Sequence, residues 1–376
     1  MKKNPSINYS RNESKDFTLA LKSRINAYFE ENNLSRKGDS LLMQKAIPIL
    51  LIWLLPYFLI LTVEMSEWMM LLLCGVIGFG FFLAGGSIMH EGCHGTFSSK
   101  AWLNKLAANS MYLLGGDKLI WLVGHNELHH AYTNIPEHDI DLESGAGLLR
   151  FSEEMEWKPK HRFQQYYAFF LYSLLTITWM FLTDFMKLNK FSKLNLIRKN
   201  ADRPEKNWIK MILIKLGVWF FWLGIPILVL NLPIWKILLG FAFLHLVAGI
   251  ALTLVFQLAH LTEVSEMPLA DEEGNIDNNW FVHQLYTTAN WAPKSRIAHW
   301  LTGGLNHQIE HHLFPGISHV HYPQLAPIVK RTAEEFGIPY FEYKSFGKAI
   351  AAHYQHLKEM GKRPDSESKK ESVTFA

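Results

Sequence analysis

Three clusters of histidines are the part of this sequence best suited to chemistry. The first is His90-Glu91-Gly92-Cys93-His94, the second begins at His125, and the third lies within residues 303–315. Imidazole nitrogens ligate iron, zinc and copper, and two histidines four residues apart share one face of a helix. Each cluster lies near a long apolar run, so the sequence predicts a metal centre at the face of a membrane. The cluster histidines are His90, His94, His125, His129, His130, His311 and His312.

The number of histidines favours two metal ions over one. His260, which ends the last long apolar run, is an eighth candidate. Eight neutral ligands are too many for one four-coordinate zinc, and they leave bound ions highly charged and able to bind oxide, hydroxide or dioxygen. Two irons fit the count best. Five carboxylates near the clusters are expected to accept hydrogen bonds from the far ring nitrogens of the ligands: Glu91, Glu127, Glu310, Asp139 and Asp141.

A rival interpretation comes from the first cluster alone. Its spacing matches His-Glu-x-x-His, in which two histidines hold zinc and the glutamate is the general base of a protease. That site needs only one further ligand, so it leaves the other two clusters unexplained. Measured metal content separates the two interpretations, because the protease would hold one zinc per chain and an oxidase two irons. The remaining histidines fit hydrogen-bonding roles better than ligation, and His245, inside an apolar run, fits a core role. The others are His138, His161, His283, His299, His319 and His321.

The composition predicts one membrane-embedded domain. Of the 376 residues, 49% are hydrophobic and 14% aromatic, and they gather in long runs. We expect a polar N-terminal cytoplasmic tail over residues 1–45, the membrane domain over 46–362 and a disordered C-terminal tail over 363–376. A net charge of +3 is too small to indicate nucleic acid binding. Two cysteines, Cys74 and Cys93, give no basis for a disulfide framework.

Four apolar runs are long enough to cross a membrane as helices, since about 20 residues span the hydrocarbon core. They are residues 46–63, 68–89, 208–231 and 234–258, which we expect to form two hairpins. A fifth run, residues 165–185, lies between the second and third clusters. If it crossed, it would make three crossings between these clusters, together with the third and fourth runs, and would put the clusters on opposite sides of the membrane. The basic residues after residue 185 would then also be exported, against the positive-inside bias. We therefore expect the fifth run to be embedded without crossing, in an all-α membrane protein whose cytoplasmic helical cap carries the histidines.

Shorter segments complete the expected architecture. Residues 17–29 fit a short amphipathic helix, and residues 102–124 fit a helix and loop along the membrane surface. The acidic residues 263–277 indicate a loop. Residues 323–362 fit amphipathic helices interrupted at Gly337-Ile338-Pro339, because proline and glycine break helices.

Between and around the clusters, over residues 90–329, the sequence resembles the membrane fatty acid desaturases. It is most similar to their front-end branch, because Gln308-Ile309-Glu310-His311-His312 carries glutamine where other desaturases have the first histidine. The resemblance implies that the eight candidate histidines hold two irons and that Gln308 lies near the metal or orders a ligand. With Glu91, Glu127 and Glu310, Gln308 is our candidate for a catalytic role. His307 is ambiguous, because its spacing pairs it with His311 whereas family members commonly carry an aromatic residue there.

The resemblance also implies an activity and its partners. The implied activity is an O₂-dependent dehydrogenation that introduces a cis double bond into a CoA-linked or lipid-linked acyl chain. No His-Pro-Gly-Gly motif of a fused haem domain is present, so electrons are expected from a separate ferredoxin or small cytochrome, docking on the basic cytoplasmic face of a bacterial inner-membrane enzyme. A fatty acyl hydroxylase of the same superfamily is the nearest alternative. A transporter is disfavoured, because transport sites lie near the bilayer midplane.

Overall fold

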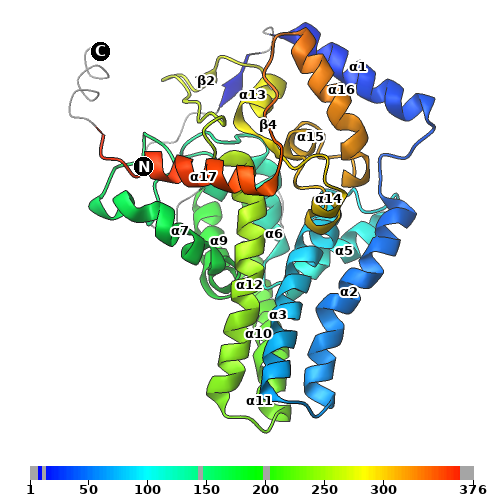
Figure 1. Cartoon of the computed structure of the whole chain (residues 1–376), viewed down its shortest axis with the longest axis vertical. Helices are drawn as coiled ribbons and strands as arrows, with labels where there is room; N and C mark the ends of the chain where they lie inside the picture. The colour runs from blue at the N-terminus through cyan, green and yellow to red at the C-terminus, as the bar shows by residue number, and fades with distance from the viewer. Residues whose placement is uncertain (1–6, 11–13, 143–146, 198–203, 365–376) are drawn as a thin grey trace.

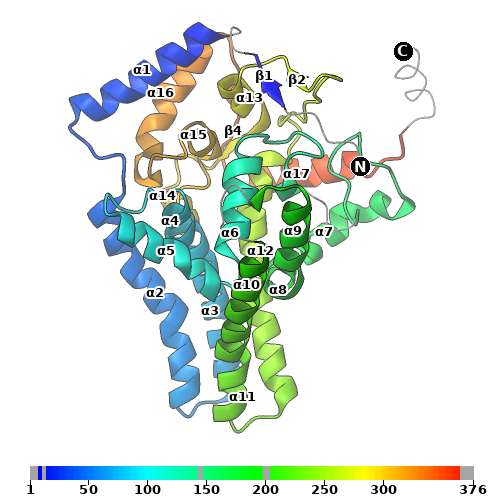
Figure 2. The same ribbon diagram turned by 180° about the vertical axis from the view of Figure 1, so that it is seen from behind.

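The computed structural model describes residues 7–10, 14–142, 147–197 and 204–364, and most of them are helical. Figures 1 and 2 show a narrow bundle of long helices that ends near α11, and a broader half at the opposite end where the shorter helices gather. The expectation of a helical protein with four membrane-spanning runs is confirmed at this level.

Four helical runs in the described part of the chain are long and apolar enough to cross a membrane. The first is α2 (Asp39–Thr62), and the second joins α3 (Glu67–Ala84), the π-helix η1 (Gly85–Met89) and α4 (His90–Cys93). The third joins α10 (Pro204–Trp219), the π-helix η7 (Phe220–Gly224) and α11 (Ile225–Val229), and the fourth is α12 (Ile234–His260). All four predicted runs are present, although α2 begins at Asp39 rather than at residue 46.

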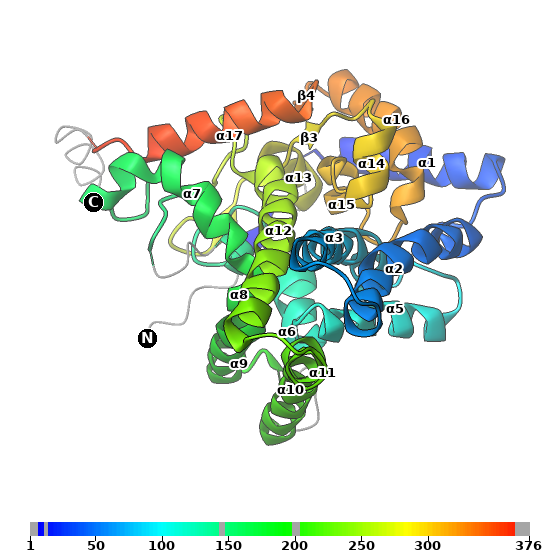
Figure 3. The same ribbon diagram turned by 60° about the horizontal axis from the view of Figure 1, so that its bottom comes forward.

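The helix α3 is the centre of this bundle. It packs against α2 on one side and α12 on the other, and Figure 3 shows it between the two. Trp53 of α2 and Phe81 of α3 are both buried and meet edge to face with ring centroids 5.5 Å apart. Aromatic pairs of this kind add roughly 0.5–1.5 kcal/mol beyond the burial of their area. Because α3 runs on into the first histidine cluster, its packing fixes where His90 leaves the bundle.

The fifth apolar run is a bent pair of helical segments. The 3-10 turn η4 (Pro159–Phe163) leads into α7 (Gln164–Ser173), and the second segment joins α8 (Leu175–Thr178), the π-helix η5 (Trp179–Thr183) and α9 (Asp184–Lys193). The two segments are bent by 55°. The first packs against α12 and α17 (Phe346–Met360). A bend of this size excludes a single straight crossing of a membrane by the pair.

The shorter elements occupy the broad half of the molecule. Between the second span and the bent pair lie α5 (Ala101–Leu113), α6 (Lys118–Trp121), the π-helix η2 (Leu122–His129) and the 3-10 turn η3 (Ile140–Leu142). After the fourth span come α13 (Trp280–Thr287), α14 (Arg296–Thr302), α15 (Gln308–Leu313), the 3-10 turn η8 (His319–His321) and α16 (Tyr322–Glu335). The expected helix and loop over residues 102–124, and the break at Gly337 between α16 and α17, are both confirmed.

The expected amphipathic helix over residues 17–29 lies within α1 (Lys15–Glu31). Its buried side chains recur every four residues and therefore share one face: Phe17, Leu21, Ile25 and Phe29. This face packs against α16. Of the predicted C-terminal tail, the residues after Pro364 lie outside the described part of the chain.

Two short pairs of strands were not predicted. The strand β1 (Asn8–Tyr9) pairs in parallel with β2 (Asn275–Ile276), and β3 (Asn290–Trp291) pairs in parallel with β4 (Glu342–Tyr343). Two-residue pairings carry no periodic hydrophobic signal, because periodicity needs longer runs. They correct the all-α expectation only locally, and each ties segments far apart in the sequence.

A buried ion pair fastens the bent segment to the third span. Lys215 Nζ of α10 lies 2.7 Å from Asp184 Oδ2 of α9, and both side chains are buried. Asp184 also accepts hydrogen bonds from Trp179 Nε1 at 2.8 Å and from the backbone N–H of Asp117 at 2.7 Å. Lys215 donates to the carbonyls of Gly115 and Trp179. The charges are therefore paired and fully hydrogen-bonded, which is what burial of an ion pair requires.

Breaking this pair on one side is expected to destabilise the protein strongly. Lys215→Met leaves Asp184 buried without its counter-ion, and such losses cost about 3–5 kcal/mol. Replacing both residues, Asp184→Leu with Lys215→Met, should restore most of that loss. The control is Lys236→Met, which removes a partly exposed ion pair with Glu67 and should cost less than about 1 kcal/mol. Thermal unfolding in detergent measures all three, and a Lys215→Met protein as stable as the control would contradict the prediction.

Candidate metal centre

Histidines from four separate parts of the chain meet in the broad half of the molecule. They come from α4 and the residue after it, η2 and the residue after it, the end of α12, and α15. Two groups of ring nitrogens form, and within each group the nitrogens all lie within 4.8 Å of one another. The first group is His90, His94, His125 and His311, and the second is His129, His260 and His312.

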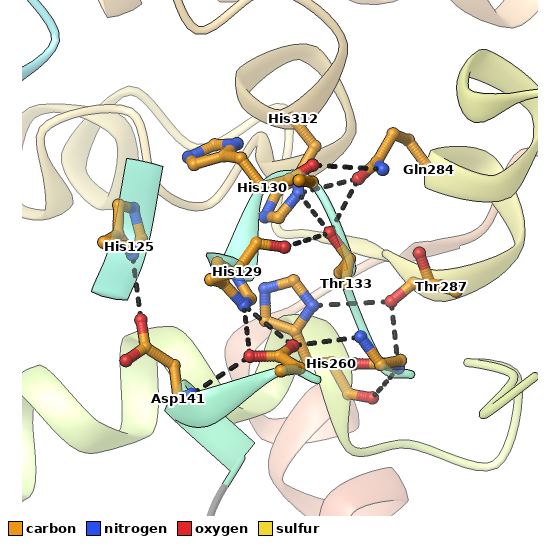
Figure 4. A network of polar contacts seen from close by, with 12 residues as sticks. His125, His129, His130, Thr133, Asp141, His260, Gln284, Thr287 and His312 are labelled. Carbon is orange, nitrogen blue, oxygen red and sulfur yellow. Dashed lines mark hydrogen bonds and ion pairs between the residues drawn. The ribbon is translucent and has the colours of Figure 1, made fainter. Parts of the chain in front are cut away.

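His130 lies between the two groups. Its ring centroid is 4.6 Å from that of His311 in the first group and 4.5 Å from that of His312 in the second. Figure 4 shows His130, His129, His260 and His312 close together. The structure therefore brings all eight predicted metal histidines into one place.

The inner ring nitrogens of these histidines have no protein partner. In all eight residues Nε2 is buried and finds no hydrogen-bond partner among the described residues. Burying a polar atom without a partner is costly, so seven such nitrogens in two tight groups, with that of His130 between them, are a donor set suited to metal ions. Nitrogen donors suit iron, zinc and copper, whereas calcium and magnesium prefer oxygen.

Carboxylates fix the outer nitrogens of two histidines, as the sequence predicted for Asp139 and Asp141. His125 Nδ1 lies 3.1 Å from Asp141 Oδ2, and His129 Nδ1 lies 2.9 and 3.0 Å from the two oxygens of Asp139. A ring whose Nδ1–H donates outward presents the lone pair of Nε2 inward. Figure 4 shows Asp141 below His125, with a dashed line that joins the carboxylate to the ring.

The charge environment keeps these carboxylate contacts in place. Burial raises the pKa of Asp141, but Lys187 Nζ, 3.2 Å from Asp141 Oδ1, and the contact with His125 hold that pKa well below its usual range. Burial lowers the pKa of His129, but Asp139 outweighs it and raises that pKa above the ordinary value. The lowered pKa keeps Asp141 negatively charged beside His125, and the raised pKa of His129 reflects the charge of Asp139 next to its Nδ1.

Other outer nitrogens bond to residues that the sequence did not single out. His312 Nδ1 lies 2.9 Å from Gln284 Oε1. His311 Nδ1 lies 3.2 Å from the hydroxyl of Tyr322, and this hydroxyl donates its own proton to the carbonyl of Ile317 at 3.0 Å. The hydroxyl oxygen therefore accepts from His311. Neither Gln284 nor Tyr322 belongs to a spaced motif with its histidine, so only the tertiary structure reveals them.

Widened helical turns orient the first two clusters. The second cluster lies in the π-helix η2, where the N–H of His130 donates to the carbonyl of His125 at 3.0 Å, five residues back. In such a turn the side chains at i, i+4 and i+5 project from one side. His125, His129 and His130 can therefore face both groups at once. The π-helix η1 stands directly before His90.

The third cluster docks on the first through a contact between backbones. A side chain at Gly86 would come within 2.7 Å of the carbonyl oxygen of Thr302, and one at Gly303 would collide with the carbonyl of Gly86. Gly303 also has φ of +65°, a left-handed conformation that favours glycine. These two glycines let the turn before α15 approach η1 closely, which brings His311 to His90 with ring centroids 4.6 Å apart.

Two of the cluster glutamates, Glu91 and Glu310, bond to other partners than the metal histidines. Glu91 is buried, and its Oε1 accepts from the backbone N–H and the ring Nδ1 of His319 at 2.9 and 2.7 Å. Lys45 Nζ lies 3.1 Å from the other ring nitrogen of His319. Glu127, in contrast, is exposed on η2. Glu91 therefore ties η8 to the first cluster, a link the sequence did not predict.

Glu310 has a comparable structural contact. Its two oxygens accept from Asn290 Nδ2 and from the hydroxyl of Tyr340, each at 2.8 Å. Burial raises the pKa of Glu310 to about 7. The contacts join α15 to β3 and to the segment before β4.

Gln308 and His307 occupy different surroundings. Gln308 is the first residue of α15, and its Oε1 is buried without a hydrogen-bond partner among the described residues. His307 belongs to neither nitrogen group. It lies against His299 with ring centroids 5.3 Å apart and contacts Asn306 Oδ1 at 3.2 Å. His245 bonds to Thr176 Oγ1 at 3.0 Å within the bundle, which confirms its core role.

Two aromatic side chains cover the groups. Trp121 stacks on His125 with ring centroids 4.4 Å apart and also contacts His90 and His94. Phe256 lies 4.9 Å from His129 and 5.0 Å from His260, between ring centroids. Each group therefore has an apolar wall.

Comparison with known proteins gives consistent matches. The family model described as fatty acid desaturase matches residues 66–344. An sn-1 linoleoyl-lipid 6-desaturase of Arthrospira platensis is 35% identical over 359 residues, covering 94% of each chain. A protein of the same name from Synechocystis sp. is 34% identical over 93% of this chain and 97% of its own. An acyl-lipid (8-3)-desaturase of Physcomitrium patens is 30% identical over 96% of this chain and 74% of its own.

The glycine contact leads to a prediction about metal binding. Gly303→Ala adds a Cβ in a left-handed conformation and against the carbonyl of Gly86, so α15 must move and the first nitrogen group should open. The purified variant is expected to lose most of its bound metal, measured by elemental analysis per chain. The control is Gly316→Ala, since a Cβ there meets nothing within 4 Å. Equal metal content in both variants would show that the contact does not position the group.

Proposed function

Since the chain belongs to the fatty acid desaturase family and is an acyl desaturase of the front-end type, we propose that its eight clustered histidines hold two irons. With O₂ and external electrons the enzyme introduces a cis double bond into the acyl chain of a membrane lipid. The observation that carries this proposal is the pair of nitrogen groups, in which every Nε2 is buried without a protein partner among the described residues.

Each group supplies ligands for one iron. His90, His94, His125 and His311 would hold the first, and His129, His260 and His312 the second, with His130 between them. Two irons held this way supply the redox chemistry that uses O₂ to remove hydrogens from an unactivated carbon chain. A protease with one zinc would leave the second group without a use, and the family match gives no support to that reading.

The residues around the groups orient the ligands and exclude water. Asp139, Asp141 and Gln284 hold outer ring nitrogens, which fixes the direction of the inner ones. Trp121 and Phe256 put apolar surface against the groups, so an acyl chain can lie beside them without competing water.

Among the candidate catalytic residues, Gln308 is best placed. Its buried amide oxygen has no partner among the described residues and is available to a group at the irons. We assign Glu91 and Glu310 to positioning, because each bonds to a neighbouring element. The catalytic role of Glu127, which is exposed, remains a prediction.

The shared site bears on the membrane topology. Histidines before and after the bent pair belong to the same nitrogen groups, so an even number of crossings must separate them. The third and fourth spans supply two crossings, which favours a bent pair that enters and does not cross. The positive-inside bias of the lysines after α8 supports a cytoplasmic site and two hairpins, in a bacterial inner membrane.

The substrate follows from the relatives that align over nearly the whole chain. Two of them are named sn-1 linoleoyl-lipid 6-desaturases, so we propose that the acyl chain is esterified to a glycerolipid and already carries a double bond. The new bond then forms between that bond and the carboxyl end. A CoA-linked chain and a hydroxylated product are the alternatives.

Expression in a bacterial host that lacks polyunsaturated lipids tests the reaction. With linoleate supplied, mass spectrometry of the membrane lipids should locate a new double bond nearer the carboxyl end than the existing ones. A hydroxyl group at that position would support the hydroxylase instead. No change in any lipid or acyl-CoA, in a host that supplies electrons, would contradict the proposed function.

Removing one ligand of the first group should abolish both metal binding and product. His311→Ala takes a nitrogen from a group in which all ligand atoms lie within 4.8 Å. We expect about two irons per chain in the unchanged protein and a loss of iron and of new double bonds in the variant. His138→Ala, in a loop where the ring lies near the carbonyl of Pro136, is the matched control. One zinc per chain in the unchanged protein would remove the iron assignment.

Loss of the charge on Asp139, the carboxylate behind His129, should weaken metal binding less than loss of a ligand does, but by a measurable amount. Asp139→Asn keeps the shape and removes the charge that orients Nδ1–H, and losses at such positions are about ten- to hundredfold in metal affinity. Competition with a chelator measures the affinity. Asp277→Asn, an exposed aspartate in the loop after β2, is the control, and an unchanged affinity for Asp139→Asn would contradict the role.

A further inference from the structure

We propose that an electron-carrier protein with an acidic contact surface docks on the lysines of α9, and that its electrons reach the first nitrogen group through Asp141 and His125. The lysines are Lys187, Lys190 and Lys193. This inference rests on the proposed function, because only an O₂-dependent desaturase needs the electrons.

The electron balance requires such a partner. Forming the double bond removes two hydrogens from the chain, and O₂ leaves as two molecules of water. The substrate supplies two of the four electrons that reduce O₂, along with two protons. Two further protons come from solvent, and two one-electron carriers in their reduced form supply the remaining two electrons and are oxidised. The carrier must therefore approach the site twice for each bond formed.

One chain of polar contacts leads from the nitrogen groups to a charged side chain that reaches the surface. His125 Nδ1 lies 3.1 Å from Asp141 Oδ2, and Asp141 Oδ1 lies 3.2 Å from Lys187 Nζ. The side chains of Asp141 and Lys187 are 19% and 24% exposed. Electron transfer weakens steeply with every gap it must cross through space, so a path of covalent bonds and two short contacts favours entry at this point.

The outer partners of three other metal histidines, His129, His311 and His312, do not lead outward in this way. His129 is backed by Asp139, whose side chain is 1% exposed. His312 and His311 are backed by Gln284 and Tyr322, both buried. The path through Asp141 is distinguished by ending on a positive charge.

The surface around Lys187 has the charge that an acidic carrier needs. The three lysines are spaced by three residues, so they lie near one another along one side of the helix. Lys193, at the end of α9, is exposed, and Lys206 and Lys210 are exposed at the start of the neighbouring α10. Figure 2 shows α9 beside α10, in the broad half of the molecule and away from the α11 tip. Opposite charges of this kind steer association and fix its orientation.

The face near α17 has the opposite character. A cavity of about 670 Å³ opens there between α17 and the loops that follow residue 150 and α12. Its lining includes Glu153, Glu154, Glu263 and Glu359, and no lysine or arginine. A negatively charged carrier would be repelled from it, which leaves α9 as the favoured side.

Direct binding is the first test, with a purified acidic [2Fe–2S] ferredoxin as the probe and the intact, iron-loaded protein in detergent. The variant Lys190→Glu with Lys193→Glu reverses two charges without touching the contact between Lys187 and Asp141. We expect its Kd for ferredoxin to rise about tenfold or more at low salt, and to lose most of the salt dependence seen in the unchanged protein. The matched control reverses two exposed lysines of α17, Lys348→Glu with Lys358→Glu, and should bind as the unchanged protein does.

A small-molecule reductant separates docking from the reaction itself. If dithionite reduces the irons without O₂ present, and O₂ is added after the excess dithionite is removed, the α9 variant should form double bonds in one turnover at the unchanged rate, because the irons and the substrate site are not altered. Equal ferredoxin binding by the two double variants would overturn the docking surface. The same assay in vesicles tests a lipid contact. If the α9 variant also lost activity with dithionite, and did so only in vesicles that contain phosphatidylglycerol, the lysines would bind lipid headgroups instead. If the unchanged protein formed no double bond with either reductant, this would count against the proposed function. The comparison of ferredoxin binding between the variants would still test the docking surface, because it does not depend on product formation.

The route inward has its own test. Asp141→Asn keeps the lysines, so ferredoxin should bind with the same Kd. Oxidation of prebound ferredoxin, followed by its absorbance and scaled to bound iron, should be slower than in Asp139→Asn, whose carboxylate backs His129 and contacts the backbone N–H of Asp141 but not its side chain. Equal rates in the two variants would overturn entry through Asp141.

Discussion

Eight buried imidazole nitrogens that lack partners within the described part of the chain are the constraint on which this structure depends. Leaving such atoms unsatisfied is costly, so the arrangement is stable only when other atoms satisfy them. The surrounding structure keeps the nitrogens aimed at one another. Carboxylates, an amide and a hydroxyl hold the outer ring atoms, and Trp121 and Phe256 close the site with apolar surface.

Departures from regular helix geometry help to direct these nitrogens toward one another. A π-helix precedes the first cluster and another carries the second, and π-helical turns are rare and concentrate at functional sites. The third cluster begins with paired glycines and meets the first through a contact of backbones at Gly86 and Gly303. The spans that lead to these segments are ordinary apolar helices. π-helical turns also occur at η5 and, within the third span, at η7, where no ligand histidine lies, so those at η1 and η2 are set apart by the ligands they orient.

The sequence predicted the features that depend on the spacing of residues and on hydropathy. The four long apolar runs, the amphipathic α1 and the histidines that gather in two groups all left periodic or local signals. It did not predict the pairing of β1 with β2, because two residues have no periodicity. It also missed Tyr322, Gln284 and the link from Glu91 through His319 to Lys45, since these contacts join distant segments and depend on tertiary packing. The expected contacts of Glu91 and Glu310 with ligand histidines were wrong for the same reason, because a carboxylate near a histidine in sequence can bond to another element.

The distribution of ligands along the chain has a consequence for biosynthesis. The first nitrogen group needs His311 and the second needs His312, so neither is complete until the ribosome has translated α15. By then all four candidate spans have been synthesised, because each ends before residue 261. Neither group can therefore have its full set of ligands while the spans themselves are being made, and a polypeptide that ends before α15 would carry incomplete histidine sets.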